Sequence, residues 1–372
     1  MDNLGIKNMN KTSKKLIHGG DITSAREELG RLDNPPGILD FSANVNPLGL
    51  PEGVKRAIRE SIDTFDIYPD PLCRELVSAL SRHEAVSAEW VLCGNGAADL
   101  IYRTVHAVKP KKAMVLAPTF AEYEEALNTA DCRVVPYPLK EENGFRSDER
   151  LLDALESGLD MLFLCNPNNP TGQLMTKDFL LIILRRCQSL GILLFMDECF
   201  NDFLENPEGY TTKDFLKDFD NLVILKAFTK IYAMAGLRLG HCISSDTGLL
   251  ERIRAAGQPW SVSSPAQLAG IRAVEEKNYL ARTKELIRAE RGYLIPALEN
   301  FGITVIGSNA NYIFVKDPRI SEKPLHQMLF EKGILIRNCD NYRGLGPGFY
   351  RICIRRHEDN VKLVEALKAV RG

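Results

Sequence analysis

Residues 161–198 read MLFLCNPNNPTGQLMTKDFLLIILRRCQSLGILLFMDE, with a short apolar run near each end of the stretch. Each run, at Met161–Leu164 and at Ile192–Met196, has the length and unbroken hydrophobicity of a buried parallel strand. Between the runs, Lys177–Ser189 has the pattern of a helix. The order strand, helix, strand predicts a βαβ unit, in which a helix joins two parallel strands and covers their sheet.

The same alternation continues on both sides of this unit. Further strands are predicted at Ala113–Leu116 and Leu222–Leu225, and further helices at Ala97–Ala107 and Thr212–Lys217. The central block is therefore predicted to be an α/β domain with a doubly wound sheet. After Trp260 the pattern changes to a long helical stretch, two strands and a last helix, which predicts a separate α+β lobe. These elements are expected at Pro265–Leu298, Tyr312–Val315, Tyr350–Ile354 and Asn360–Val370.

The length of 372 residues is enough for two domains that each bury a core. We expect residues 1–48 to form an N-terminal segment that joins the small domain. Residues 49–262 are expected to form the large α/β domain, and residues 263–372 the small α+β domain.

Composition excludes several classes of function. The chain has 47 basic and 49 acidic residues and is 45% hydrophobic, which indicates neither a nucleic-acid-binding nor a membrane-binding surface. The polar stretch Met1–Lys15 does not resemble a signal peptide, so a cytoplasmic location is expected. The nine cysteines form no CxxC pair and are expected to be reduced, mostly buried thiols. No cluster has zinc-ligand spacing, so no metal site is expected.

Unusual residues follow four predicted strands, one of them a further apolar run at Trp90–Cys93, at the edge where open α/β sheets bind ligands. They are Gly94-Asn95-Gly96, Pro118-Thr119-Phe120, the loop NPNNPTG at residues 166–172, and Asp197-Glu198. Because parallel strands end at one edge of the sheet, these four junctions are expected to converge on one site.

Each junction has a chemical and a structural interpretation. The turn at Gly96 opens a helix and suits a phosphate, although it could simply be a turn. Asn169 could donate a hydrogen bond to a phenolate oxygen, or could form an Asx turn. Asp197 ends an apolar strand, where a carboxylate needs a cation or a strong donor such as a pyridinium N–H. A helix cap or an ordinary ion pair would also satisfy Asp197.

Residues 226–240, KAFTKIYAMAGLRLG, carry the strongest chemical signal. Lys230 stands among apolar and small residues, where desolvation lowers the pKa of an amine and makes it a usable nucleophile for a Schiff base. Thr229 and Arg238 could bind a phosphate, the arginine through two parallel hydrogen bonds. A snorkelling surface position for Lys230 is the alternative.

Taken in order, these motifs resemble the fold-type I pyridoxal 5′-phosphate enzymes of the class I/II aminotransferase family. The resemblance covers most of the chain and implies a mainly parallel seven-stranded sheet between helices, with a smaller α+β domain. It also implies roles for individual residues. Lys230 would carry the cofactor as a Schiff base, Asp197 would bind the pyridine nitrogen, Asn169 the ring hydroxyl, and Phe120 would stack on the ring. The cofactor phosphate would be surrounded by Gly96, Ala97, Ala98, Thr229 and Arg238.

The resemblance further implies a homodimer, in which Tyr68 extends to the phosphate of the neighbouring subunit's cofactor. Two positions depart from the pattern of the family. Phe200 stands where many members have a tyrosine, so a hydrogen bond to the cofactor ring is missing. Ala227 replaces a common hydroxyl residue, so phosphate binding would depend on Thr229 and the backbone.

Two further features bear on the substrate, which is expected to be a small phosphorylated amino acid. Arg337 and Arg351 suit carboxylate and phosphate groups. The N-terminal motifs HGGD at residues 18–21 and DFSANVNPLG at residues 40–49 resemble the L-threonine-O-3-phosphate decarboxylases of cobalamin synthesis. By this resemblance His18, Asn44, Arg337 and Arg351 would bind the substrate.

The alternatives are a histidinol-phosphate aminotransferase or a related amino-acid aminotransferase, and a protein of the same fold that binds without turnover. His18 and Phe200 favour the decarboxylase over the aminotransferase.

Overall fold

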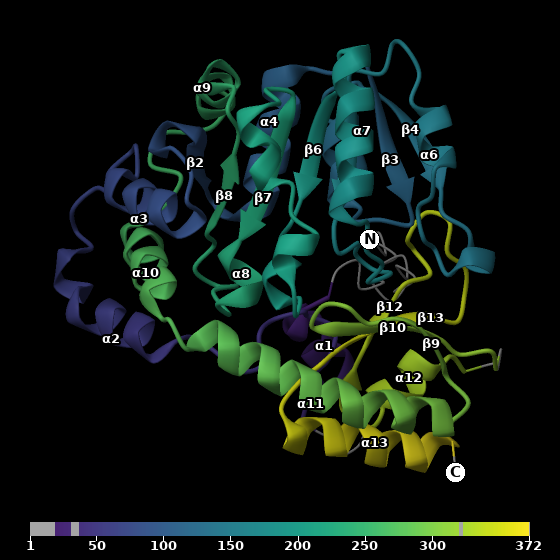
Figure 1. Ribbon diagram of the computed structural model, residues 1–372. Coiled ribbons are helices and arrows are strands. Elements are labelled where there is room, and N and C mark those ends of the chain that lie inside the picture. Colours follow the sequence, from purple (N-terminus) through teal and green to yellow (C-terminus); the bar gives the residue numbers. More distant parts are fainter. Residues whose placement is uncertain (1–18, 31–36, 320–322, 372) are drawn as a thin grey trace, which may run out of the picture.

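The computed structural model describes residues 19–30, 37–319 and 323–371. Within these ranges seven strands form the large sheet, in the order β2-β8-β7-β6-β5-β3-β4 (Figure 1). Only β8 is antiparallel to both of its neighbours, so the mainly parallel seven-stranded sheet is confirmed. The strands are β2 (Val91–Gly94), β3 (Lys112–Ala117), β4 (Arg133–Pro138), β5 (Met161–Cys165), β6 (Leu193–Asp197), β7 (Leu222–Ala227) and β8 (Gly240–Ile243).

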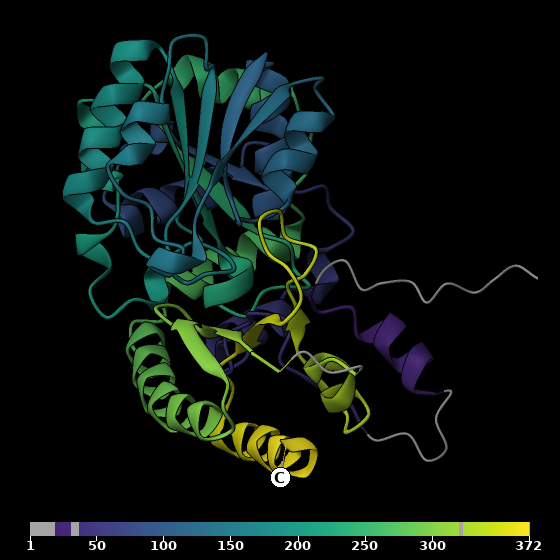
Figure 2. The same cartoon turned by 90° about the vertical axis from the view of Figure 1, so that its right-hand side faces the viewer.

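Alternate residues of the central strands enter two different cores, one on each face of the sheet. Leu162 and Leu194 pack with one set of helices, whereas Phe163 and Phe195 pack with another. The first face is covered by α6 (Arg150–Ala154) and α7 (Lys177–Leu190). The second is covered by α4 (Gly96–Val108), α5 (Glu122–Asn128) and α9 (Thr247–Ala255), so the sheet lies between two helical layers (Figure 2).

Three local predictions were incomplete or wrong. The strand β4 was not predicted, because it lies at the edge of the sheet and contains exposed residues and two prolines. The strand β8 has only four residues and begins at Gly240, so its signal is weak. The helix predicted at Thr212–Lys217 is a short 3₁₀ helix at Lys213–Lys217.

The second lobe contains an antiparallel sheet in the order β12-β13-β10-β9 among the described residues. Its strands are β9 (Thr304–Gly307), β10 (Tyr312–Lys316), β12 (Arg337–Asn338) and β13 (Phe349–Cys353). A further parallel pair joins β1 (Leu39–Asp40) to β11 (Ile334–Leu335). The helices α11 (Tyr279–Asn300), α12 (Leu325–Phe330) and α13 (His357–Arg371) belong to this lobe (Figure 1).

The long helix predicted at Pro265–Leu298 is two helices, because residues 276–278 interrupt it. The first of them, α10 (Ser264–Glu275), packs against α2 (Glu52–Glu60) and α3 (Arg74–Glu84). A last short helix, α1 (Ile22–Leu29), lies near the N-terminal end of the described chain. The domain boundaries at residues 48 and 262 stay predictions. No helix in the described ranges is long and apolar enough to cross a membrane.

Candidate active site

A cavity of about 330 Å³ lies where the carboxyl edge of the large sheet meets the second lobe. It brings together most of the residues that the sequence singled out, although they come from distant parts of the chain. The predicted residues that line it are Asn44, Ala97, Ala98, Phe120, Asn169, Asp197, Thr229, Lys230, Arg238, Arg337 and Arg351.

Two of the described predicted residues, Gly96 and Tyr68, do not line this cavity. Gly96 is the first residue of α4 and lies directly beneath Arg238, outside the lining. Tyr68 is 79% exposed, and its ring lies 5.0 Å from that of Trp260. His18 falls outside the described residues.

Asp197 is the last residue of β6 and is only 5% exposed. The Tyr123 hydroxyl donates to its Oδ2 at 2.5 Å, and the Cys199 N–H donates to its Oδ1 at 2.9 Å. Burial raises the pKa of Asp197, although these two donors and the nearby Lys230 partly oppose the rise. No described lysine, arginine or histidine forms an ion pair with this carboxylate. It is therefore a buried acceptor that can still take a cationic N–H.

Lys230 lies in α8 (Phe228–Ile231), the single turn that follows β7. Its amine faces the cavity and is partly buried. Burial and the guanidinium groups of Arg351 and Arg238 lower the pKa of Lys230. Asn46 stabilises this turn through two hydrogen bonds. Its backbone N–H donates to the Lys230 carbonyl at 3.0 Å, and its Nδ2 donates to the Ile231 carbonyl at 2.7 Å.

Asn169 and Arg351 meet across the two lobes. The Nη1 of Arg351 donates to Oδ1 of Asn169, and its Nη2 donates to the Ser42 carbonyl at 2.9 Å. The guanidinium also lies over the ring of Tyr312 at 5.6 Å. The Nε of Arg351 is buried and has no hydrogen-bond partner within the described residues. This arginine is thus oriented but not fully satisfied, as expected of a group that binds an anion.

Arg337 stands opposite Arg351 in the register of β12 and β13. Its Nη2 donates to Oδ1 of Asn341 at 3.0 Å, and its guanidinium lies 5.2 Å from the centre of the Tyr342 ring. The pairing of two short strands therefore places two guanidinium groups on the wall of one cavity.

The N-terminus of α4 forms a narrow cradle with Arg238. A Cβ on Gly240 would lie 2.8 Å from the Ala97 nitrogen, so only glycine lets β8 approach this helix so closely. A Cβ on Gly96 would lie 2.6 Å from Nη2 of Arg238. Arg238 itself adopts a φ of 59°, which is uncommon for a residue other than glycine. Helix N–H groups, the buried Thr229 and this arginine form a donor set for a phosphate.

Several residues at the site were not singled out by the sequence. Tyr123 lies behind the wall and comes three residues after Phe120, and this proximity could have indicated that it supports the same site. Asn341 and Tyr342 line the cavity in the loop that follows β12, which has no other signal. Ser42 was part of a quoted motif but was given no role; its N–H and hydroxyl both donate to Oδ1 of Asp40.

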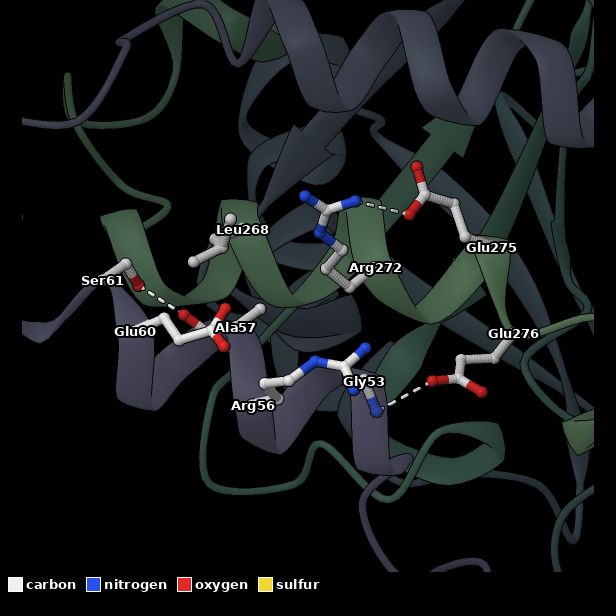
Figure 3. A pocket seen from close by; sticks show the side chains of 9 residues that line it. All are labelled: Gly53, Arg56, Ala57, Glu60, Ser61, Leu268, Arg272, Glu275 and Glu276. Atoms are coloured by element: carbon white, nitrogen blue, oxygen red, sulfur yellow. Dashed lines mark hydrogen bonds and ion pairs between the residues drawn. The ribbon is translucent and has the colours of Figure 1, made fainter.

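A second pocket lies between α2 and α10, and some of its polar groups are paired with one another (Figure 3). Arg272 pairs with Glu275 at 2.8 Å, and the Gly53 N–H donates to Glu276 at 2.9 Å. None of the predicted site residues lines it.

Comparison with known proteins matches residues 36–367 to the family described as aminotransferase class I and II. A threonine-phosphate decarboxylase of Salmonella typhimurium is 40% identical over 354 residues, which cover 95% of this chain and 96% of that protein. A bifunctional adenosylcobalamin biosynthesis protein of Leptospira interrogans is 32% identical over 361 residues, which cover 95% of this chain and 41% of that protein. The crystal structure of the histidinol-phosphate aminotransferase from Clostridium acetobutylicum matches with a TM-score of 0.84 and 29% identity, covering 90% of this chain and 99% of that chain.

Proposed function

Because the chain belongs to the aminotransferase class I and II family of pyridoxal 5′-phosphate enzymes, we propose that it decarboxylates L-threonine O-3-phosphate in cobalamin biosynthesis. The product would be (R)-1-amino-2-propanol O-2-phosphate. The observation that carries this proposal is the pair Arg337 and Arg351, which face the same cavity as Lys230. Two guanidinium groups suit a substrate that bears both a carboxylate and a phosphate. The identity to the Salmonella typhimurium decarboxylase supports the same choice.

The cavity fits the cofactor on its donor chemistry. Asp197 would accept the ring N–H, since it is a buried carboxylate with no ion pair among the described residues. Asn169 would bind the ring hydroxyl, and Phe120 would lie against the ring face. The cradle of Ala97, Ala98, Thr229 and Arg238, beside Gly96, would hold the phosphate. When bound, the cofactor supplies an electron sink for the bond that breaks at the substrate Cα.

Lys230 has two tasks in this proposal. Its lowered pKa leaves more of the amine neutral near neutral pH, which favours covalent binding of the cofactor. The same amine, once displaced by the substrate, can carry a proton. After CO₂ leaves, it would return that proton to Cα.

The arginines and Asn44 would hold the substrate. Arg351 would bind the α-carboxylate, because its buried Nε still lacks a partner among the described groups. Arg337 would bind the phosphate. Both polar side-chain atoms of Asn44 are buried and have no described partner, so this amide is also available to a ligand.

The second candidate is transamination of histidinol phosphate, which the match to the Clostridium acetobutylicum structure favours. The same two arginines would hold the two carboxylates of 2-oxoglutarate. Both reactions would use Asp197 to accept the ring N–H and Lys230 to attach the cofactor. They differ in the bond broken at Cα, which is Cα–H in the transamination and Cα–carboxylate in the decarboxylation.

The test is to incubate the enzyme, loaded with pyridoxal 5′-phosphate, with L-threonine O-phosphate and to measure CO₂. L-Threonine, which lacks the phosphate, is the matched control substrate. We expect CO₂ from the phosphorylated substrate and much less from the control. Transamination of histidinol phosphate with 2-oxoglutarate, without CO₂ from threonine phosphate, would overturn the proposal. A protein that binds the cofactor but converts neither substrate would support the non-catalytic alternative.

We also propose that the enzyme acts as a homodimer in the cytoplasm. The apolar side chains of Ile62, Ile67, Tyr68, Leu72 and Trp260 are all exposed, which is the composition of an interface. A second copy would cover them, and Tyr68 would then extend toward the partner's cofactor phosphate. The nine cysteines all lie in described ranges as free, buried thiols, as a reducing compartment favours.

Sedimentation tests the dimer. The variant Ile67→Asp with Trp260→Asp is expected to be monomeric, whereas Ile182→Asp is the matched control. Ile182 is also exposed, at 49%, but lies on α7, away from the segment that carries Tyr68. Dimers that persist in the double variant would overturn this interface.

A further inference from the structure

A buried group of charges lies beneath the cavity, and none of its members lines the cavity itself. Lys226 of β7 is its centre: its Nζ lies 3.1 Å from Oδ1 of Asp202 and 3.5 Å from Oε1 of Glu84. Lys213 approaches the second oxygen of Glu84 at 3.3 Å. His241 of β8, the register partner of Lys226, places Nε2 at 3.4 Å from Glu84. We call these five residues the Lys226 cluster.

The centre of the cluster is buried, whereas Asp202 and Lys213 at its edge are partly exposed. Glu84 is 3% exposed and Lys226 is 7% exposed. Burial opposes the charge on Lys226, but the carboxylates of Asp202, Glu84 and Glu198 outweigh it and raise its pKa. Burial likewise opposes the charge on Glu84, but Lys226 and His241 outweigh it and lower its pKa. Two carboxylates and two ammonium groups thus face one another. Glu84 and Lys226 lie in the interior, where removal of one leaves the other short of a partner.

Lys226 joins two segments that both contribute residues to the cavity wall. Asp202 lies in the short helical turn at Asn201–Phe203, directly after Phe200, which lines the cavity. Lys226 is next to Ala227 at the end of β7, and Thr229 and Lys230 follow. The pairing of β6 with β7 joins these segments as far as Asp197 and Leu225, and the ion pair of Lys226 with Asp202 adds a side-chain connection beyond the ends of the strands.

We infer that Lys226 is a positioning residue that fixes the distance between Asp197 and Lys230, and hence the fit of the cofactor between them. This inference rests on the proposed cofactor site, but not on the choice of substrate. Supporting groups of this kind typically change affinity or activity about 10- to 100-fold when they are removed.

The test compares Lys226→Met with Lys213→Met. Both variants remove one ammonium group from Glu84, but only the first removes the contact to Asp202. Cofactor affinity is measured by titration of the visible absorbance, and thermal unfolding is followed in parallel. We expect Lys226→Met to weaken cofactor binding and to lower kcat about tenfold or more, with KM changed little. Lys213→Met should keep both values near those of the wild type, and Lys226→Arg should recover part of the loss.

Asp202→Asn gives a second test in case Lys226→Met does not fold. It removes the negative charge from the connection to the cavity wall but leaves Lys226 paired with Glu84. We expect a severalfold loss of cofactor affinity. Wild-type affinity and kcat in Asp202→Asn, or equal losses in Lys226→Met and Lys213→Met, would overturn the inference. A wild type that binds the cofactor but releases no CO₂ would refute the proposed reaction and leave this test intact.

Discussion

Two lysines four residues apart, Lys226 and Lys230, show how the fold gives one residue type two opposite properties. Lys226 is the last residue but one of β7 and lies among carboxylates, which outweigh the effect of burial and raise its pKa. Lys230 lies one turn later, where burial and the neighbouring Arg351 lower its pKa. The first amine is a fixed cation in the interior. The second is a candidate nucleophile that faces a cavity.

The difference teaches that burial alone does not mark a reactive lysine. Both amines leave bulk water, but only Lys226 has carboxylate partners, Glu84 and Asp202. The buried carboxylates differ in the same way. Asp197 has no cation within ion-pair distance in the described chain, whereas Glu84 has two lysines. A buried charge without a partner marks the candidate cofactor site, and a paired one supports the scaffold.

The largest effect is expected from Asp197→Asn, which tests the Lys230 side of the comparison. Loss of the carboxylate that would bind the ring nitrogen should lower kcat about 100- to 1000-fold, the range seen when a preorganised electrostatic group is removed. Steady-state kinetics on the holoenzyme measure it. A loss under fivefold would contradict the role of Asp197.

The variant Asp197→Asn is expected to lower kcat but to stabilise the folded enzyme without cofactor. Because the pKa of Asp197 is raised in the folded state, its contribution to stability is full below the unfolded pKa of about 4. That contribution is lost as pH rises through the folded pKa. Asp197→Asn should therefore be more stable than the wild type at neutral pH, and the difference should shrink at pH 4. Denaturant unfolding at both pH values checks this sign.

Glu84→Gln tests the Lys226 side. Breaking a buried ion pair leaves an uncompensated charge and should cost about 3 kcal/mol in the free energy of unfolding. The pKa of Glu84 is lowered in the folded state, so its stabilisation is present above an unfolded pKa of about 4 and is lost as pH falls through the folded pKa. The cost of the substitution should therefore fall in acid. An unchanged free energy of unfolding in Glu84→Gln at pH 7 would contradict this role of Glu84.

The smallest effect is expected from Phe200→Tyr. Phe200 is buried in the cavity wall against Tyr312, at the position where the family resemblance implies a tyrosine. A hydroxyl here would add one hydrogen bond to the cofactor, worth about 1 kcal/mol, or about fivefold in affinity. Cofactor titration measures this change. Weaker binding in the variant would show that the wall has no space for the hydroxyl.

The sequence predicted the family, the cofactor and the sheet because their signals are contiguous. The motifs that contain Asn169, Asp197 and Lys230 each directly follow an apolar strand. A short stretch of sequence is therefore enough to recognise each of them. The family match to residues 36–367 confirms that resemblance. The binding roles of these residues, including the substrate residues, stay predictions.

Features that depend on pairing across the fold could not be predicted in the same way. Glu84 and Lys226 are far apart in sequence and look like ordinary surface charges until α3 is placed against β7. The pairing of Asn169 with Arg351 likewise appears only when the two lobes meet. The edge strand β4 was missed because its exposed residues and prolines weaken the strand signal.

The most direct measurement is to load the enzyme with pyridoxal 5′-phosphate, reduce it with borohydride, and map the modified peptide by mass spectrometry. The account predicts the cofactor mass on Lys230 and none on Lys226, and no labelling in Lys230→Met. Labelling of Lys226, or equal labelling of Lys230→Met and the wild type, would contradict it.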